Sequence, residues 1–492
     1  MNDLKEKTIR GGVARLGAQV ANFALRTISL MVLARLLAPK DFGLVGMVTA
    51  FTGVLGLFRD FGLSSAVIQR DRVTDEQLST LFWINILVGF LLTVLVLGMA
   101  PAIAVFYHEP RLIGVTASLA TAFLFNAAGV QHGAILQRQM RFTTLSLINT
   151  IALVLSTGAA IAAAMLGLGY WSLVVMAVVF PLITTIGNWL TAGWTPGAPQ
   201  KNSGVRSMMR FGSAVTLNSL IWYVATNLDK VLLGRYWGMD ALGLYGRAYQ
   251  LINIPTDNIN SAAGEVAFAA LSRVQNDSIR LKNYFLKGYM LVLAMTLPVA
   301  IGCALFADDL ISVVLGAKWQ DTAPIFRLLA PSVLGFAIGN PLAWLLFSTG
   351  RVGRSTLMSL ASSPIMILAY VLALPYGPKG VAAAYSAGMM IWILPAIAWA
   401  VHGTGIAFKD ILLTIKWPLV SGIAAAAAAY AVRTKCEPWV STFPRLIIES
   451  GIMLIVYLGV LIFVSGQKSF YADLLRGLLG SASAERKDLV PL

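Results

Sequence analysis

Polar and charged side chains recur at helical spacing inside four of the apolar stretches of this chain. At about 100° per residue, Arg15, Asn22 and Arg26 fall on one face of the first stretch. Arg59 lies on a polar face of the second stretch. The seventh and eighth stretches repeat this arrangement with a second group of residues. That group comprises Asn218, Trp222 and Asp229 in the seventh stretch and Arg247, Gln250 and Asp257 in the eighth.

Basic groups outnumber acidic ones on these faces. A charged side chain near the middle of a bilayer costs about 2.5–3.5 kcal/mol, so it is expected to line a hydrated space or to pair with another helix. An excess of arginine in such a space favours an anion, because the planar guanidinium donates two parallel hydrogen bonds to a phosphate. We therefore predict a binding site for a phosphate-bearing substrate. Its predicted residues are Arg15, Asn22, Arg26, Arg59, Asn218, Trp222, Arg247 and Gln250.

The two aspartates in these stretches have a different expected role. Asp229 and Asp257 are candidates for ion coupling, in which a carboxylate takes up a proton or a sodium ion when its arginine partner engages phosphate. A structural alternative is that Asp229, Lys230 and Arg247 form ion pairs between helices. Trp222 has an alternative role in an interfacial aromatic belt. By contrast, the interiors of the predicted helices nine to fourteen carry almost no charge.

The composition places these residues in a membrane. Hydrophobic residues make up 58% of the 492 positions and charged residues only 12%, whereas soluble domains carry roughly 25% charged residues. Apolar runs of about 20 residues, each long enough to cross a bilayer, account for this composition. We predict an all-α polytopic protein of about fourteen transmembrane helices. They are expected near residues 14–35, 42–64, 79–105, 111–134, 143–166, 171–194, 211–235, 242–264, 284–306, 322–347, 355–374, 381–402, 416–432 and 444–465.

The distribution of Lys and Arg predicts the orientation. With the N-terminus in the cytoplasm, the cytoplasmic segments hold about 23 of the 37 basic residues and the outer segments about 10. Cytoplasmic loops of membrane proteins carry such an excess, so both termini are predicted to lie in the cytoplasm. The same excess explains the net charge of +15 without a nucleic-acid partner.

A repeat at a spacing of 200 residues predicts the domain organisation. Residues 10–12 match residues 210–212, and Gly43-Leu44-Val45-Gly46 matches Gly243-Leu244-Tyr245-Gly246. Six helices per half is an even number, so both halves start on the same side and are parallel repeats. The predicted parts are a six-helix lobe at residues 1–200, a second six-helix lobe at 201–405, and a final helix pair with a short tail at 406–492.

The segment Leu33–Arg70 resembles a known family. Its two runs, LARLLAPKDFGLVGMVTAF and LFRDFGLSSAVIQR, are similar to the Wzx-type lipid-linked oligosaccharide flippases. The similarity is greatest to the colanic-acid-flippase-like branch of the polysaccharide transporter family, within the multidrug/oligosaccharidyl-lipid/polysaccharide exporter superfamily. The resemblance implies two six-helix lobes plus a final pair, and a cationic central cavity that opens alternately to the two sides.

The resemblance also implies a substrate and a location. The substrate is an oligosaccharide repeat unit linked to undecaprenyl diphosphate, carried from the cytoplasmic to the periplasmic face of the bacterial inner membrane. The pathways implied are exopolysaccharide, capsule or lipopolysaccharide biosynthesis. The implied partners are this lipid-linked oligosaccharide, membrane lipid, a polysaccharide polymerase and a chain-length regulator.

Two other function classes compete with a flippase. A drug or small-cation antiporter of the same superfamily would need an acidic or neutral aromatic cavity, whereas this cavity is predicted to be basic. A membrane enzyme of polysaccharide assembly would need catalytic groups, but the sequence has no Ser–His–Asp arrangement, Gly-rich phosphate loop or metal-ligand cluster. We therefore expect a transporter without enzymatic activity, cofactor or metal.

Overall fold

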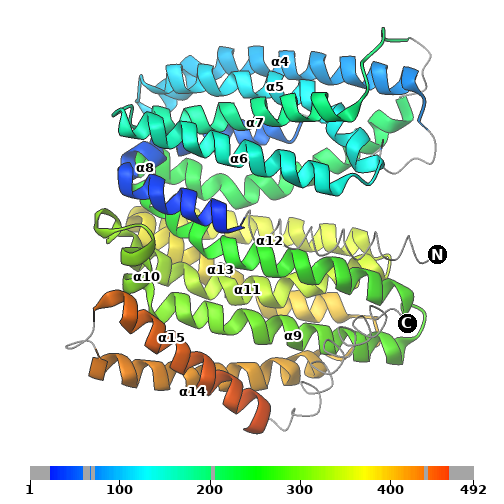
Figure 1. Ribbon diagram of the computed structural model, residues 1–492. Helices are drawn as coiled ribbons and strands as arrows, with labels where there is room; N and C mark the ends of the chain where they lie inside the picture. The colour runs from blue at the N-terminus through cyan, green and yellow to red at the C-terminus, as the bar shows by residue number, and fades with distance from the viewer. Residues whose placement is uncertain (1–22, 59–66, 68–72, 201–205, 437–440, 465–492) are drawn as a thin grey trace, which may run out of the picture. The chain divides into compact units, whose positions relative to one another are not determined.

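The structure is a computed structural model that describes residues 23–58, 67, 73–200, 206–436 and 441–464 (Figure 1). All regular elements in these ranges are helices, and no strand occurs among them. The longer helices are residues 23–36, α2 (Pro39–Gly56), α4 (Asp75–Tyr107), α5 (Leu112–Arg138), α6 (Phe142–Met165), α7 (Trp171–Ala192), α8 (Arg206–Arg273), α9 (Ser278–Leu305), α11 (Thr322–Ser348), α12 (Val352–Ala373), α13 (Gly377–Val401), α14 (Phe408–Cys436) and α15 (Thr442–Gly459). The short ones are α10 (Ala307–Val314), η1 (Ala317–Trp319), η2 (Leu374–Tyr376) and η3 (Val460–Val464).

Each apolar run of the sequence overlaps one of these helices. The seventh and eighth runs overlap the same one, α8, which spans 68 residues and contains a non-helical turn at Gly238 with φ 79° and ψ −174°. Glycine adopts this positive φ without the steric cost that a Cβ atom imposes. α8 therefore consists of two helical arms, a first arm at residues 206–237 and a second arm at residues 239–273.

Local capping explains where several helices begin. At the start of α4 the Thr74 side chain accepts a hydrogen bond from the backbone N–H of Gln77, and the Gln77 side chain accepts one from the backbone N–H of Thr74. This reciprocal capping box satisfies donors that a helix end leaves free. At the start of α9 the Asp277 carboxylate accepts hydrogen bonds from the backbone N–H groups of Ile279 and Arg280.

Among the described residues, nine helical segments are long and apolar enough to cross a membrane. One of them, Val352–Val401, has 50 residues and contains α12 and α13, which is enough chain for two crossings at about 20 residues each. α2 and α8 are not among the nine. The number of crossings and the positions of the termini stay predictions.

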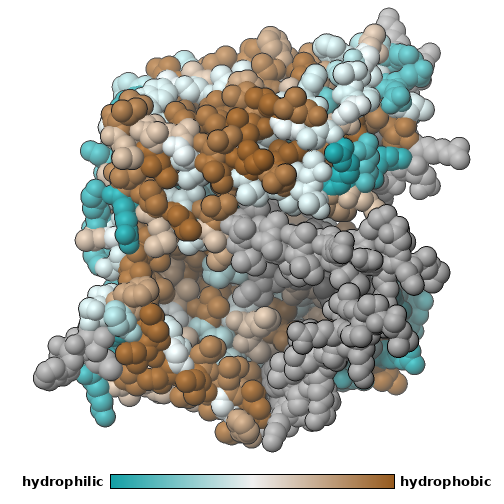
Figure 2. Space-filling view, viewed as in Figure 1, coloured by the Kyte–Doolittle hydropathy of each residue, from teal (hydrophilic) through white to brown (hydrophobic). Residues whose placement is uncertain are grey.

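Exposed apolar side chains form stripes along the outer helices, as contact with lipid requires. On α6 the exposed fractions of Leu147, Ile151, Val154 and Leu155 are 60%, 46%, 49% and 50%, and their spacing of three to four residues puts them on one face. Figure 2 shows hydrophobic side chains gathered over α6 and α7, with hydrophilic ones toward the helix ends.

The chain forms two compact units. Unit one comprises Met1–Arg247, Val314–Asp321 and Ser363–Val381, and unit two comprises Ala248–Val313, Thr322–Ser362 and Ala382–Leu492. In unit one, α4 and α5 pack so closely that a Cβ atom on Gly89 would lie 2.3 Å from the Cβ of Ala127. The predicted lobe boundaries at residues 200 and 405 stay a prediction.

In unit two, α14 and α15 are held against α9 by an apolar core. Leu297 of α9 packs with Ala425 and Ala429 of α14 and with Met453 and Tyr457 of α15. All five side chains are buried, so the last two helices are an integral part of this unit.

A cluster of charged side chains lies at one end of this core. Asp309 of α10 is 4% exposed and accepts a hydrogen bond of 2.5 Å from Arg445 of α15. Arg445 also lies 3.8 Å from Glu449, whose side chain is fully buried. Arg433 of α14 lies 3.6 Å from Asp309, and Arg327 of α11 lies 2.5 Å from Asp308.

This cluster corrects one expectation. The last helices were predicted to carry almost no internal charge, yet Arg445 and Glu449 are buried on α15. Their spacing of four residues places them on the same helical face, which allows an ion pair inside an otherwise apolar helix. Buried charges survive in such a place only when they are paired and hydrogen-bonded.

Replacing Arg445 with methionine should strongly destabilise unit two. Methionine keeps the apolar stem but leaves Asp309 and Glu449 buried without this basic partner, a loss of about 3–5 kcal/mol. The measurement is chemical unfolding in detergent micelles, and adding Asp309→Asn should recover part of the loss. The matched control is Arg280→Met, which breaks an ion pair of 3.2 Å whose side chains are 73% and 49% exposed, and should cost about 0–1 kcal/mol. Equal effects of Arg445→Met and Arg280→Met would show that the buried cluster does not stabilise the fold.

Candidate substrate-binding and ion-coupling site

The structure describes the side chains of five of the ten predicted site residues. Arg15, Asn22 and Arg59 lie outside the described residues, and so do the side chains of Asn218 and Trp222 on the first arm of α8. Arg26, Asp229 and Arg247 belong to unit one, and Gln250 and Asp257 belong to unit two. The substrate-binding and coupling roles of all ten stay predictions.

Asp229 lies on the first arm of α8 with its carboxyl group fully buried. Its Oδ2 accepts a hydrogen bond of 2.6 Å from the hydroxyl of Tyr245, which is itself fully buried. Its Oδ1 accepts a hydrogen bond of 2.8 Å from the backbone N–H of Lys230. These two donors offset part of the cost of taking a carboxyl group out of water.

The turn at Gly238 makes the contact between Asp229 and Tyr245 possible. In a straight α-helix, residues 16 positions apart are separated by about 24 Å along the axis. The hydrogen bond of 2.6 Å therefore requires the second arm of α8 to fold back against the first. The buried tyrosine on one arm then serves as the donor for the buried aspartate on the other.

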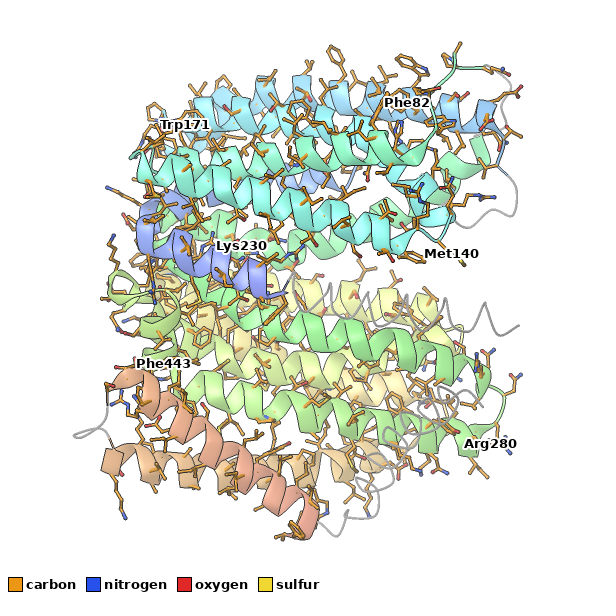
Figure 3. The ribbon with its side chains drawn as sticks, viewed as in Figure 1. Phe82, Met140, Trp171, Lys230, Arg280 and Phe443 are labelled. Atoms are coloured by element: carbon orange, nitrogen blue, oxygen red, sulfur yellow. The ribbon has the colours of Figure 1, made fainter. Side chains whose placement is uncertain are left out.

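Lys230 begins a chain of hydrogen bonds from α8 to α2. Its Nζ donates to Oδ1 of Asn227 over 2.6 Å, and Nδ2 of Asn227 donates to the carbonyl oxygen of Tyr223 over 3.0 Å (Lys230 is labelled in Figure 3). The hydroxyl of Tyr223 reaches the carbonyl oxygen of Thr49 on α2 at 3.3 Å. A Cβ atom on Gly53 would lie 1.9 Å from that hydroxyl, so glycine at position 53 leaves the space that the tyrosine occupies.

Arg247, on the second arm of α8, packs over an aromatic ring of α2. Its guanidinium carbon lies 3.9 Å from the centre of the Phe42 ring. On another side, Phe42 meets the buried ring of Trp319 edge-on, with 5.3 Å between the ring centres. A desolvated cation–π contact of this kind contributes about 2 kcal/mol. Phe42 thus stabilises the charge of Arg247 without supplying an opposite charge.

The remaining described candidates are exposed. The side chain of Arg26, on the helix at residues 23–36, is exposed, and so are those of Gln250 and Asp257 on the second arm of α8. An exposed charged group on a helix among apolar neighbours faces water rather than lipid, because lipid offers it no hydrogen-bond partner. These three residues are therefore accessible to a ligand or an ion.

Two residues of this region were missed by sequence reasoning. Tyr245 and Phe42 hold Asp229 and Arg247 in place, and the sequence predicted neither of these two contacts. The sequence contained one signal for Tyr245, since Gly238 separates two polar stretches and glycine is a common turn residue. For Phe42 the only signal was its position next to the repeated Gly43.

The fold and this region define the class of the protein. Long apolar helices that carry a buried aspartate beside half-buried lysine and arginine side chains are typical of membrane transporters. Residues 32–324 match the family model described as polysaccharide biosynthesis protein. The match covers more than half of the chain, so the protein belongs to that family.

Three comparisons describe its relatives. The chain is 28% identical over 375 residues to the lipopolysaccharide biosynthesis protein WzxC of Escherichia coli (strain K12), which covers 75% of each protein. It is 33% identical over 294 residues to the teichuronic acid biosynthesis protein TuaB of Bacillus subtilis (strain 168), covering 59% of this chain and 61% of the relative. Among solved structures, the lipid II flippase MurJ in an inward closed conformation shares its fold, with a TM-score of 0.75 and 15% identity over 95% of this chain and 100% of the other.

These findings confirm the family resemblance that the segment Leu33–Arg70 indicated. The chain is a multi-pass protein of the bacterial inner membrane. Its fold is an all-helical one of the kind that MurJ adopts.

Replacing Tyr245 with phenylalanine should destabilise unit one. The substitution removes one of the two described donors to the buried carboxyl group of Asp229, at a cost of about 1–3 kcal/mol. Unfolding in detergent measures the effect, which should shrink when Asp229 is already asparagine, because the two residues are in contact. Tyr289→Phe is the control, since that hydroxyl donates to a carbonyl oxygen at 3.3 Å and should contribute less. If Tyr245→Phe lowers the free energy of unfolding equally with and without Asp229→Asn, this hydrogen bond does not stabilise unit one.

Proposed function

We propose that this protein is a flippase that moves oligosaccharide repeat units linked to undecaprenyl diphosphate from the cytoplasmic to the periplasmic face of the inner membrane. The observation that carries the proposal is membership of the polysaccharide biosynthesis protein family, with relatives named for lipopolysaccharide and teichuronic acid biosynthesis. A fold shared with a lipid II flippase is consistent with it, because that protein is also a flippase. The product would feed exopolysaccharide, capsule or lipopolysaccharide biosynthesis, with a polymerase and a chain-length regulator as partners.

The proposed architecture is two six-helix lobes, residues 1–200 and 201–405, followed by a helix pair in residues 406–492. Both termini lie in the cytoplasm, as the excess of Lys and Arg on that side supports. The overlap between the longer helices and the fourteen apolar runs supports the proposed number of helices. Substrate enters between the lobes on the inner side and leaves between them on the outer side, without any covalent step.

The diphosphate is the part of the substrate that the protein recognises through charge. Arg26 and Arg247 bind it together with Arg15 and Arg59, and the polyprenyl chain remains in lipid. Asn22, Asn218, Gln250 and Trp222 line the path of the sugar. The exposure of Arg26 supports this assignment, and so does the packing of Arg247 on the ring of Phe42, which stabilises a cation at this position.

Removing Arg247 or Arg26 should slow flipping. Loss of charge-assisted hydrogen bonds worth about 1.5–3 kcal/mol corresponds to roughly a 10- to 150-fold loss of affinity for the diphosphate. The assay measures transfer of lipid-linked oligosaccharide across proteoliposomes for Arg247→Ala and Arg26→Ala. Arg247→Lys, which keeps the charge but not the planar fork, should fall in between. Arg280→Ala, at an exposed position in the first turn of α9, serves as the control. Wild-type rates in both alanine variants would refute the diphosphate site.

Asp257 is the proposed ion-coupling carboxylate that exchanges most directly with solution. Its side chain is exposed, whereas that of Asp229 is buried beneath Tyr245. Asp257→Asn should therefore abolish the dependence of flipping on an imposed proton or sodium gradient, because the amide binds neither ion as a carboxylate does. The measurement compares initial rates with and without each gradient. If the gradient dependence is unchanged in Asp257→Asn, this residue has no part in coupling.

A further inference from the structure

The two halves of the internal repeat meet at equivalent glycines within unit one. A Cβ atom on Gly43 of α2 would lie 1.7 Å from the carbonyl oxygen of Met239 and 3.0 Å from the backbone nitrogen of Gly243. A Cβ atom on Gly243 would lie 2.0 Å from the carbonyl oxygen of Pro39 and 3.2 Å from the backbone nitrogen of Gly43. Met239 lies four positions before Gly243 in the sequence, and Pro39 lies four positions before Gly43. Each glycine therefore faces the carbonyl group four positions before the other glycine, so the contact is reciprocal.

α2 and the second arm of α8 cross at Gly43 and Gly243, and at this crossing the two helix backbones are in direct contact. Pairs of glycines allow helices in membranes to approach this closely, and the contact is made of van der Waals packing and weak Cα–H···O interactions. No side chain fits between α2 and the second arm of α8 at this point. The contact between Gly43 and Gly243 is therefore tight and is made by backbone groups rather than by charged side chains.

The residues around the crossing strengthen it on both sides. A Cβ atom on Gly46 would lie 3.6 Å from Cγ of Leu242, so these positions are in ordinary contact. Next to Gly43, Phe42 packs against Arg247 from the second arm of α8. Trp319, which also packs on Phe42, donates from Nε1 to the carbonyl oxygen of Ala34 over 2.8 Å and fixes the end of the first helix. In the predicted orientation this end of α2 faces the periplasm.

We propose that the crossing of Gly43 and Gly243 is the closed contact of the outer gate, and that both glycines are positioning residues for transport. The proposal rests on the proposed flippase function. An oligosaccharide that leaves between the two lobes on the periplasmic side passes only when α2 and the second arm of α8 separate. The same contact must form again before the cavity reopens to the cytoplasm.

Arg247 connects this gate to the substrate. In the closed contact its guanidinium packs on Phe42, which lies on the opposite side of the crossing. Binding of the diphosphate draws the guanidinium away from the ring and so weakens one of the contacts that hold the gate shut. Substrate binding thereby lowers the cost of opening on the outer side, and an empty cavity keeps the gate closed.

A reversible disulfide tests whether the crossing must open. Gly46→Cys and Leu242→Cys are introduced in a protein whose Cys303 and Cys436 are serine, and thiol counting confirms the bond. A Cβ atom on Gly46 would lie 3.6 Å from Cγ of Leu242, which brings the two Cβ atoms near the separation of about 3.5–4.5 Å that a disulfide needs. The reduced pair should flip substrate, the oxidised pair should lose flipping, and reduction should restore it. Flipping by the oxidised pair at the reduced rate would overturn the gate.

The matched control joins two helices that belong to the same half of the repeat. A Cβ atom on Gly133 of α5 would lie 3.9 Å from Cγ of Asn188 on α7. The pair Gly133→Cys and Asn188→Cys should therefore flip substrate equally well when reduced and when oxidised. If this pair also stops flipping when oxidised, the cause is oxidation in general. The result with Gly46→Cys and Leu242→Cys would then not support the gate, and the inference would be overturned.

A second measurement needs no substrate. Leu242 is 3% exposed, so a single cysteine at this position should react slowly with a membrane-impermeant thiol reagent added from outside. Gly43→Ala forces the two backbones apart and should raise that rate several-fold, whereas Gly158→Ala, whose methyl group meets open space on α6, should not. An unchanged rate in Gly43→Ala would overturn the gate. If the reduced cysteine pair and the unmodified protein both fail to flip, the flippase function fails, and the labelling result still decides the gate.

Discussion

The turn at Gly238 is the constraint on which the polar organisation of unit one depends. A helix of 68 residues would extend far beyond the thickness of a membrane, and its polar residues would face lipid at several heights. Folding back at Gly238 places Tyr245 against Asp229. It also places Met239 and Gly243 against α2. A residue with a Cβ atom at position 238 would strain the turn, and these contacts would be lost together.

The protein stabilises its buried charges in two different ways. In unit two, Asp309, Arg445 and Glu449 form a cluster in which opposite charges lie next to each other, and such a cluster is costly to disturb. In unit one, the carboxyl group of Asp229 is held by a hydroxyl and a backbone N–H, and the guanidinium of Arg247 packs on a ring. The hydroxyl, the backbone N–H and the ring in these contacts are neutral groups. Neutral partners suit the site for a charged ligand that we propose in this region, whereas a cluster of opposite charges suits a region that stays closed.

The sequence allowed the helices to be predicted but not most of their contacts. Apolar runs located nearly every helix, because burial in lipid requires long uninterrupted stretches. The partner of Asp229 could not be predicted, since Tyr245 comes close only after the chain turns at Gly238. The pair of Arg445 and Glu449 was within reach of prediction, because its spacing of four residues inside an apolar helix is itself a signal. The repeat showed that Gly43 and Gly243 are equivalent, but equivalence does not imply contact, and only the structure shows that they touch.

The crossing combines a symmetric and an asymmetric part, and the difference bears on mechanism. The glycine contacts are reciprocal, so a movement that separates Gly43 from Met239 also separates Gly243 from Pro39, and the two contacts open together. The contact between Phe42 and Arg247 has no charged counterpart, since the repeat places Leu242 and Met47 at the equivalent positions, and both belong to one apolar cluster. Backbone shape can therefore specify closure of the proposed gate in both halves, while only one of the two equivalent side-chain contacts includes a charge. In such a gate a single arginine, Arg247, is enough to link binding of substrate in the cavity to the separation of α2 from the second arm of α8.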